Sequence, residues 1–130
     1  MIKLIKKNLL TIVGLGYVGL PLAVEFSKKM KTAGIDISKK KIRELKKRKI
    51  SSDNIDIKNI KYLKKIHFTT EPSILKKSKY IIVGVPTPIN QDKNPNLKSL
   101  IKACKMVGNN LTKNTYIIFP EFKIKIRIRT

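Results

Sequence analysis

The glycine-rich segment GLGYVG, from Gly14 to Gly19, constrains this chain more than any other feature. It directly follows the short apolar run LLTIV at 9–13, which is typical of a parallel strand buried on both faces. A helical spacing of apolar residues begins at Tyr17, so the glycines lie at a junction from strand to helix. There Gly14 would permit a tight turn, Gly16 would let the backbone approach a pyrophosphate, and Gly19 would let helix and strand pack closely. The pattern predicts a phosphate-binding turn at a helix N-terminus.

An acidic residue closes the next predicted strand. Asp36 ends the run TAGID and follows Gly14 by 22 residues. A carboxylate in this place can accept hydrogen bonds from both ribose hydroxyls of NAD, and it would repel the 2′-phosphate of NADP. Together with the turn, it indicates a dinucleotide site that prefers NAD. The alternative is that the glycines serve only a tight turn.

Segments with the pattern of strands and of helices alternate along the chain. We predict helices over 17–30, after a cap at Ser38, over 71–77 and over 97–111, and only a weak helical pattern within 51–65. Predicted strands cover 9–13, 32–37, 66–70, 80–85 and 115–119. This alternation predicts one α/β domain over 1–119, a doubly wound parallel sheet of the Rossmann type, with ligands bound beyond the carboxyl ends of the strands.

Two finer expectations concern the end of this domain. The run at 115–119 is expected to be a buried strand. The helix over 97–111 is expected to bury one apolar stripe, and Cys104 is interpreted as ordinary packing on it. The stripe comprises Leu97, Leu100, Ile101, Cys104, Val107 and Leu111.

The formal net charge of +22 raises the alternative of a basic module that binds nucleic acid or anionic surfaces. Only four of the thirty basic residues are arginines, the lysines are spread along the chain, and the aromatic residues do not alternate with them. We therefore interpret the charge as solvated lysine faces and expect no specific nucleic-acid partner.

Other classes of site are not supported by the composition. The single cysteine excludes an internal disulfide and fits a reducing cytoplasm. His67 is the only histidine and has no companion ligand, so no metal site is expected. No apolar stretch approaches the roughly 20 residues of a membrane span, so we expect no membrane partner.

The sequence segments around the glycines resemble those of one protein family. The segments TIVGLGYVGLPLAVEFSKK, GIDISKKKI and FTTEPSILKKSKYIIVGVPTPI are similar to the UDP-glucose/GDP-mannose (nucleotide-sugar) dehydrogenases, and the similarity covers about 9–119. VPTPI and NPNL look most like the branch that acts on UDP-N-acetylhexosamines. A 6-phosphogluconate or 3-hydroxyacid dehydrogenase is the alternative among enzymes, and a remnant that binds no ligand is the alternative outside them.

The resemblance implies roles for individual residues. Backbone N–H groups of Tyr17 and Val18 would contact the pyrophosphate, and Asp36 would hold the adenosine ribose. Lys41 would lie over the adenosine side of the cofactor, although a solvated lysine is its simpler interpretation. Thr87 would contact the cofactor near its nicotinamide half, although it could equally be a turn residue between prolines.

The resemblance also implies an activity that this chain does not complete. Such enzymes oxidise C6 of a UDP-sugar, here UDP-N-acetylglucosamine or UDP-N-acetylgalactosamine, to the uronate for polysaccharide synthesis, using NAD and a cysteine nucleophile. That cysteine and the sugar-binding residues are expected beyond residue 130, so the chain alone is expected to be inactive, with no catalytic residue of its own. Full-length relatives are expected to be homo-oligomers.

After about residue 119 the similarity stops. The family's Glu-Ser-Thr continuation is replaced by Pro120, Glu121, Phe122 and the basic tail KIKIRIRT. We interpret 120–130 as a divergent tail produced by a shifted reading frame or a truncated gene.

Overall fold

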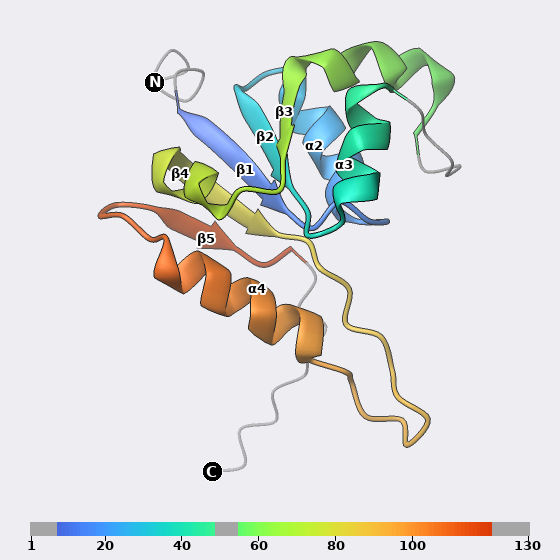
Figure 1. Cartoon of the computed structure of the whole chain (residues 1–130), viewed down its shortest axis with the longest axis vertical. Coiled ribbons are helices and arrows are strands. Elements are labelled where there is room, and N and C mark those ends of the chain that lie inside the picture. The colour runs from blue at the N-terminus through green and yellow to red at the C-terminus, as the bar shows by residue number, and fades with distance from the viewer. Residues whose placement is uncertain (1–7, 49–54, 121–130) are drawn as a thin grey trace.

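The computed structural model describes residues 8–48 and 55–120, and a parallel sheet of five strands lies at its centre (Figure 1). The strands lie side by side in the order β3-β2-β1-β4-β5, and each neighbouring pair is parallel. The chain thus winds outward from β1 in one direction and then from β4 in the other, which confirms the doubly wound prediction. The strands are β1 Leu9–Val13, β2 Thr32–Ile35, β3 Ile66–Thr69, β4 Ser78–Val83 and β5 Tyr116–Ile118.

Helices cover both faces of the sheet (Figure 1). On one face a core cluster joins the sheet to α2, α3 and the 3₁₀ helix η1. On the other face a second cluster joins it to the 3₁₀ helix η2 and to α4. The helices are α2 Gly19–Ser27, α3 Lys39–Lys46, η1 Ile57–Lys65, η2 Pro72–Lys77 and α4 Lys98–Asn109. None of the helices in the described parts of the chain has the length and apolar character needed to cross a bilayer.

Local sequence explains where α3 begins. The Oγ of Ser38 accepts a hydrogen bond from the N–H of Lys41 at 3.2 Å, as expected of an N-cap. Ile42 and Leu45 of this helix are buried in the first core cluster. The predicted cap of α3 is therefore confirmed.

The last strand differs from its prediction. All three residues of β5 are exposed, although the run at 115–119 was expected to be a buried strand. Among the described strands β5 pairs with β4 only, so it is an edge of the sheet. An apolar run indicates a strand but does not say how many neighbours cover it, so the expectation of burial was wrong. Pro120 ends the described residues, and the rest of the predicted basic tail lies outside them.

Helix α4 is also turned differently from the prediction. Its buried residues are Ala103 and Val107, with Leu100 packed beside them, whereas Cys104 is exposed. Successive helical residues are rotated by roughly 100°, so Cys104 lies well away from the direction in which Ala103 faces the sheet. The interpretation of Cys104 as buried packing was therefore wrong, because the small side chain of Ala103 marks the true inner face.

Candidate functional site

The carboxyl ends of β1, β2 and β4 meet at one edge of the sheet, where a cavity of about 480 Å³ opens. The turn after β1, the residues after β2 and β4, and one face of α4 line this cavity. Parallel strands bring their following loops to the same edge, so segments far apart in sequence share one space. The predicted site residues that line it are Gly14, Gly16, Tyr17, Val18, Asp36 and Lys41.

Gly14 makes the first turn out of the sheet. Its φ is +92°, a conformation that residues with a Cβ rarely adopt. A Cβ at this position would also lie 2.8 Å from Cγ1 of Val85, which follows β4. The N–H of Gly14 donates to the carbonyl oxygen of Ile35 at 2.8 Å, so the turn stays tied to β2 as it leaves the sheet.

Gly19 lets α2 begin directly against the strands. A Cβ on Gly19 would collide with the carbonyl oxygen of Gly14, and one on Gly84 would lie 3.0 Å from the Cα of Gly19. Backbone atoms cannot rotate out of such contacts. Gly19 therefore has the packing role predicted for it, and it is not among the residues that line the cavity.

Gly16 lies in open space. A Cβ built there meets no heavy atom within 4 Å, and Gly16 lines the cavity, so its backbone is open to close approach by a ligand. Within the described residues, the N–H groups of Gly16, Tyr17 and Val18 have no hydrogen-bond partner, whereas the carbonyl oxygens of Gly16 and Val18 accept from the first turns of α2. Free N–H groups at a helix N-terminus form an anion-binding site, since they combine donors with the positive end of the helix dipole.

Asp36 does more than the sequence indicated. Its Oδ2 accepts from the N–H of Leu15 and its Oδ1 from the N–H of Ser38, both at 2.9 Å. The side chain is only 12% exposed, so these are shielded, charge-assisted hydrogen bonds. Asp36 thereby fastens the glycine turn to the end of β2 while it lines the cavity, and no local sequence signal links it to Leu15.

Lys41 lies beside this carboxylate. Its Nζ is 3.7 Å from Oδ2 of Asp36, and its side chain is 43% exposed. Both residues line the cavity. The structure thus places Lys41 beside Asp36 in the cavity lining, and its contact with the adenosine side of a cofactor stays a prediction.

The wall formed by α4 contains residues that sequence reasoning missed. Lys98, Ser99 and Lys102 line the cavity together with Ala103 and Met106. The spacing of Lys98 and Lys102 places them on one side of the helix, which is the only sequence signal that could have paired them. Their approach to the glycine turn depends on how α4 packs on the sheet.

Thr87 was also predicted to contact a cofactor. It is exposed in the loop after β4, and the cavity lining on this side extends to Pro86 without reaching it. Its contact with the nicotinamide half of a cofactor stays a prediction.

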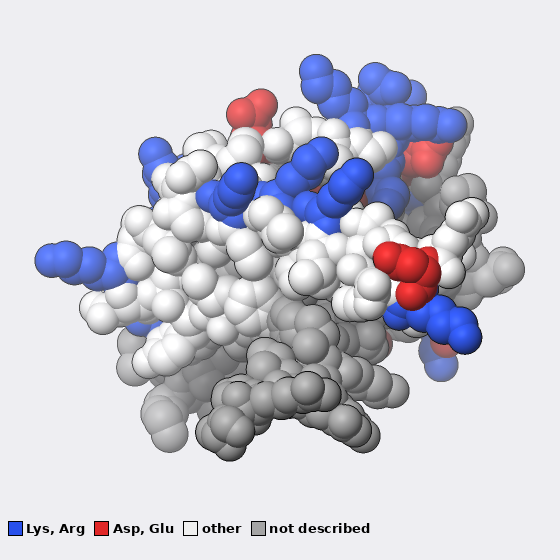
Figure 2. All heavy atoms as spheres, turned by 90° about the horizontal axis from the view of Figure 1, so that it is seen from below, with Lys and Arg blue, Asp and Glu red and all other residues white. Residues whose placement is uncertain are grey.

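Charge is distributed over the surface in separate groups. Figure 2 shows one face on which Lys and Arg side chains form several groups with uncharged surface between them. In the described part of the chain, no group of three or more His, Cys, Asp or Glu residues is arranged to hold a metal ion.

Comparison with known proteins identifies the family. The chain matches the description "UDP-glucose/GDP-mannose dehydrogenase family, NAD binding domain" over residues 8–121. It is 42% identical over 110 residues to UDP-N-acetyl-D-glucosamine 6-dehydrogenase of Salmonella typhi, which covers 85% of this chain and 26% of that protein. It is 39% identical to Protein CapL of Staphylococcus aureus, with the same coverage.

A solved structure shows the same arrangement. The UDP-N-acetyl-mannosamine dehydrogenase Cap5O from S. aureus superimposes with a TM-score of 0.75 at 30% identity, covering 86% of this chain and 28% of that chain. The chain thus spans about a quarter of the length of these relatives. The family match decides against the 6-phosphogluconate and 3-hydroxyacid alternatives. The chain belongs to the UDP-glucose/GDP-mannose dehydrogenase family and carries the NAD-binding domain of that family.

Proposed function

We propose that this chain binds NAD in the cavity beyond β1, β2 and β4, as the cofactor-binding part of a nucleotide-sugar 6-dehydrogenase. The observation that carries this proposal is that Gly16, Tyr17 and Val18 line the same cavity as Asp36, while their N–H groups have no hydrogen-bond partner among the described residues. The substrate class is a UDP-N-acetylhexosamine, UDP-N-acetylglucosamine or UDP-N-acetylgalactosamine, oxidised at C6 in the cytoplasm for polysaccharide synthesis. This assignment is supported by the relative named as a UDP-N-acetyl-D-glucosamine 6-dehydrogenase.

The residues present fit a dinucleotide. The N–H groups of Gly16, Tyr17 and Val18 would donate to the pyrophosphate, which approaches where Gly16 has no side chain. Asp36 keeps a second lone pair on each oxygen after accepting from the backbone, so its carboxylate can also accept from the ribose hydroxyls. Lys41 would lie over the adenosine side.

Bound NAD would supply the hydride acceptor for oxidation of the sugar alcohol. The residues of this chain would bind and orient it, with the phosphates at the helix N-terminus and the ribose at the end of β2. Cys104 is exposed on α4 and is not part of the cavity lining, so it does not provide the nucleophile that the reaction requires. We therefore propose that this 130-residue chain binds NAD and does not turn over sugar by itself.

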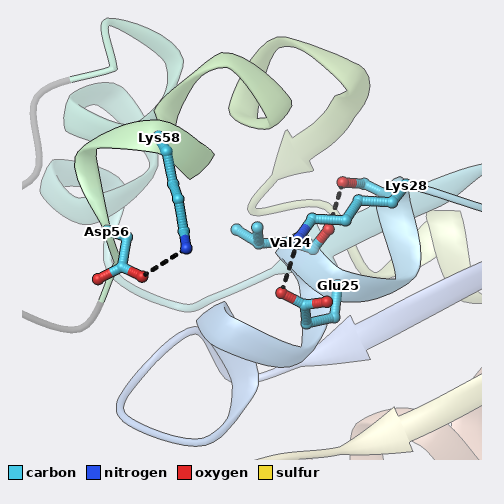
Figure 3. Close-up of polar contacts among 6 residues, drawn as sticks. Val24, Glu25, Lys28, Asp56 and Lys58 are labelled. Atoms are coloured by element: carbon cyan, nitrogen blue, oxygen red, sulfur yellow. Dashed lines mark hydrogen bonds and ion pairs between the residues drawn. The ribbon is translucent and has the colours of Figure 1, made fainter.

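Calorimetric titration of NAD and NADP into the wild type and Asp36→Asn tests this function. We expect NAD to bind more tightly than NADP, and Asp36→Asn to weaken NAD by about tenfold, the equivalent of one or two lost hydrogen bonds. The matched control is Glu25→Gln, which removes a carboxylate from the surface ion pair with Lys28, 2.9 Å long, on the outside of α2 (Figure 3).

Comparing the affinities for NAD and NADP separates loss of the ribose contact from distortion of the glycine turn. Asp36 also fastens Leu15, so a distorted turn would weaken NAD and NADP alike, whereas loss of the ribose contact weakens NAD and relieves the repulsion of NADP. Absence of NAD binding in the wild type, or unchanged NAD affinity in Asp36→Asn, would overturn the proposal.

A further inference from the structure

Besides the glycine turn, the cavity lining includes two lysines of α4. Lys98 and Lys102 of α4 both line the cavity that the turn lines. Within the described residues neither lysine has an ion-pair partner, whereas Lys41 is held 3.7 Å from Asp36. The only carboxylate in the lining is thus already next to one lysine, and the two lysines of α4 are not neutralised.

The position of Lys98 is unfavourable for the helix itself. It is the first residue of α4, where the helix dipole is positive, and the first turn contains no acidic residue. A cation at this end of a helix is disfavoured, because it is repelled by the positive end of the dipole. The N–H of Lys98 donates to Oδ1 of Asn96 at 3.0 Å, so this N–H has an acceptor, while the ammonium group adds to the positive charge of the helix start. An anion in the cavity would offset both the positive end of the helix dipole and the positive charge of Lys98.

From this geometry we propose that Lys98 and Lys102 form a cationic clamp that binds the pyrophosphate of the dinucleotide from the α4 side. The proposal rests on the proposed function, because it takes the ligand of this cavity to be a dinucleotide. The glycine turn offers neutral N–H donors on one side of the pyrophosphate, and the clamp offers two charges on the other. These two charges match the two negative charges of a pyrophosphate. Lysine suits this task because it acts as a point charge on a flexible stem.

Two double variants with the same loss of charge test the clamp. Lys98→Gln with Lys102→Gln removes the clamp. Lys105→Gln with Lys113→Gln removes two exposed lysines, one from α4 and one after it, that do not line the cavity. Calorimetry at about 0.05 M and 0.3 M salt measures the affinities for NAD, ADP and adenosine, since exposed charge interactions are strongly screened across this range.

We expect the clamp variant to bind NAD and ADP about three- to tenfold more weakly at low salt, as two partly exposed ion pairs would give. Adenosine, which has no phosphate, should bind equally to all three proteins, and the salt dependence of NAD binding should be smaller in the clamp variant. The control variant should match the wild type.

Equal losses in both double variants would overturn the clamp, because they would reflect total charge alone. A parallel loss of adenosine affinity would also overturn it, since the lysines would then contact the nucleoside. A wild type that binds ADP but not NAD, with the ADP affinity reduced in the clamp variant, would refute the proposed function while supporting the two lysines as a site for a diphosphate. A wild type that binds neither would refute both.

Discussion

Gly16 lies in the turn after β1 and Gly19 lies three residues later at the start of α2, yet a methyl group added at each should have opposite consequences. In Gly19→Ala the new Cβ would collide with the carbonyl oxygen of Gly14 and lie 2.8 Å from its carbon and 3.2 Å from Cγ2 of Ile12. Two of these atoms belong to the backbone, so α2 must move away from the sheet. Overpacking of this kind costs about 1–3 kcal/mol, and backbone contacts lie at the upper end, so we expect a loss of about 3 kcal/mol.

In Gly16→Ala the new Cβ meets no atom within 4 Å, and φ is not in the left-handed region. The reduced entropy of the unfolded chain would then stabilise the fold by about 0.4–1 kcal/mol. The methyl group would, however, occupy the space through which the pyrophosphate approaches the N–H groups. We expect NAD affinity to fall at least tenfold, a change of about 1.4 kcal/mol in binding free energy.

Chemical denaturation and calorimetric titration of NAD separate the two effects. Gly19→Ala should lower the free energy of unfolding, and Gly16→Ala should lower affinity without lowering stability. Equal stability of Gly19→Ala and wild type would refute the packing argument. Unchanged NAD affinity in Gly16→Ala would refute the assignment of the open space at Gly16 to the pyrophosphate.

Three further predictions concern the cap, the loop after β4 and the net charge. Ser38→Ala removes the acceptor of the N–H of Lys41, so it should cost about 1 kcal/mol and lower the melting temperature by about 4 °C, while Ser73→Ala at an exposed site should not. Hydrogen bonds from the backbone N–H of Asn94, and then from its side chain, lower the pKa of Asp92. These hydrogen bonds should therefore persist at pH values above the usual pKa of an aspartate and be lost as the pH falls through the lowered pKa. An NMR amide signal of Asn94 that titrates at or above the usual pKa would contradict this. Labelled duplex DNA should bind only loosely and dissociate by about 0.2 M salt, and sub-micromolar binding at that salt concentration would instead favour a nucleic-acid function.

The sequence alone determined the features that depend on neighbours along the chain. The glycine spacing after LLTIV specified the turn, because φ of +92° at Gly14 and the missing Cβ of Gly19 are local requirements. The alternation of strands and helices specified the parallel sheet, because parallel strands need crossovers. Ser38 specified the start of α3 because its hydroxyl accepts a hydrogen bond from the N–H of Lys41, only three residues later.

Only the tertiary structure decided the features that depend on what packs against a segment. Apolar composition could not show that β5 is an edge strand, or that α4 turns Ala103 inward and Cys104 outward. The hydrogen bond from Leu15 to Asp36 joins residues that are 21 positions apart. Lys98 and Lys102 line the same cavity as the glycine turn, although they lie much later in the chain. Periodicity reports which side of an element is apolar, whereas the packing of layers determines which element that side meets. The glycines of the site therefore follow from the local sequence, whereas the positions of its charged residues follow from tertiary packing.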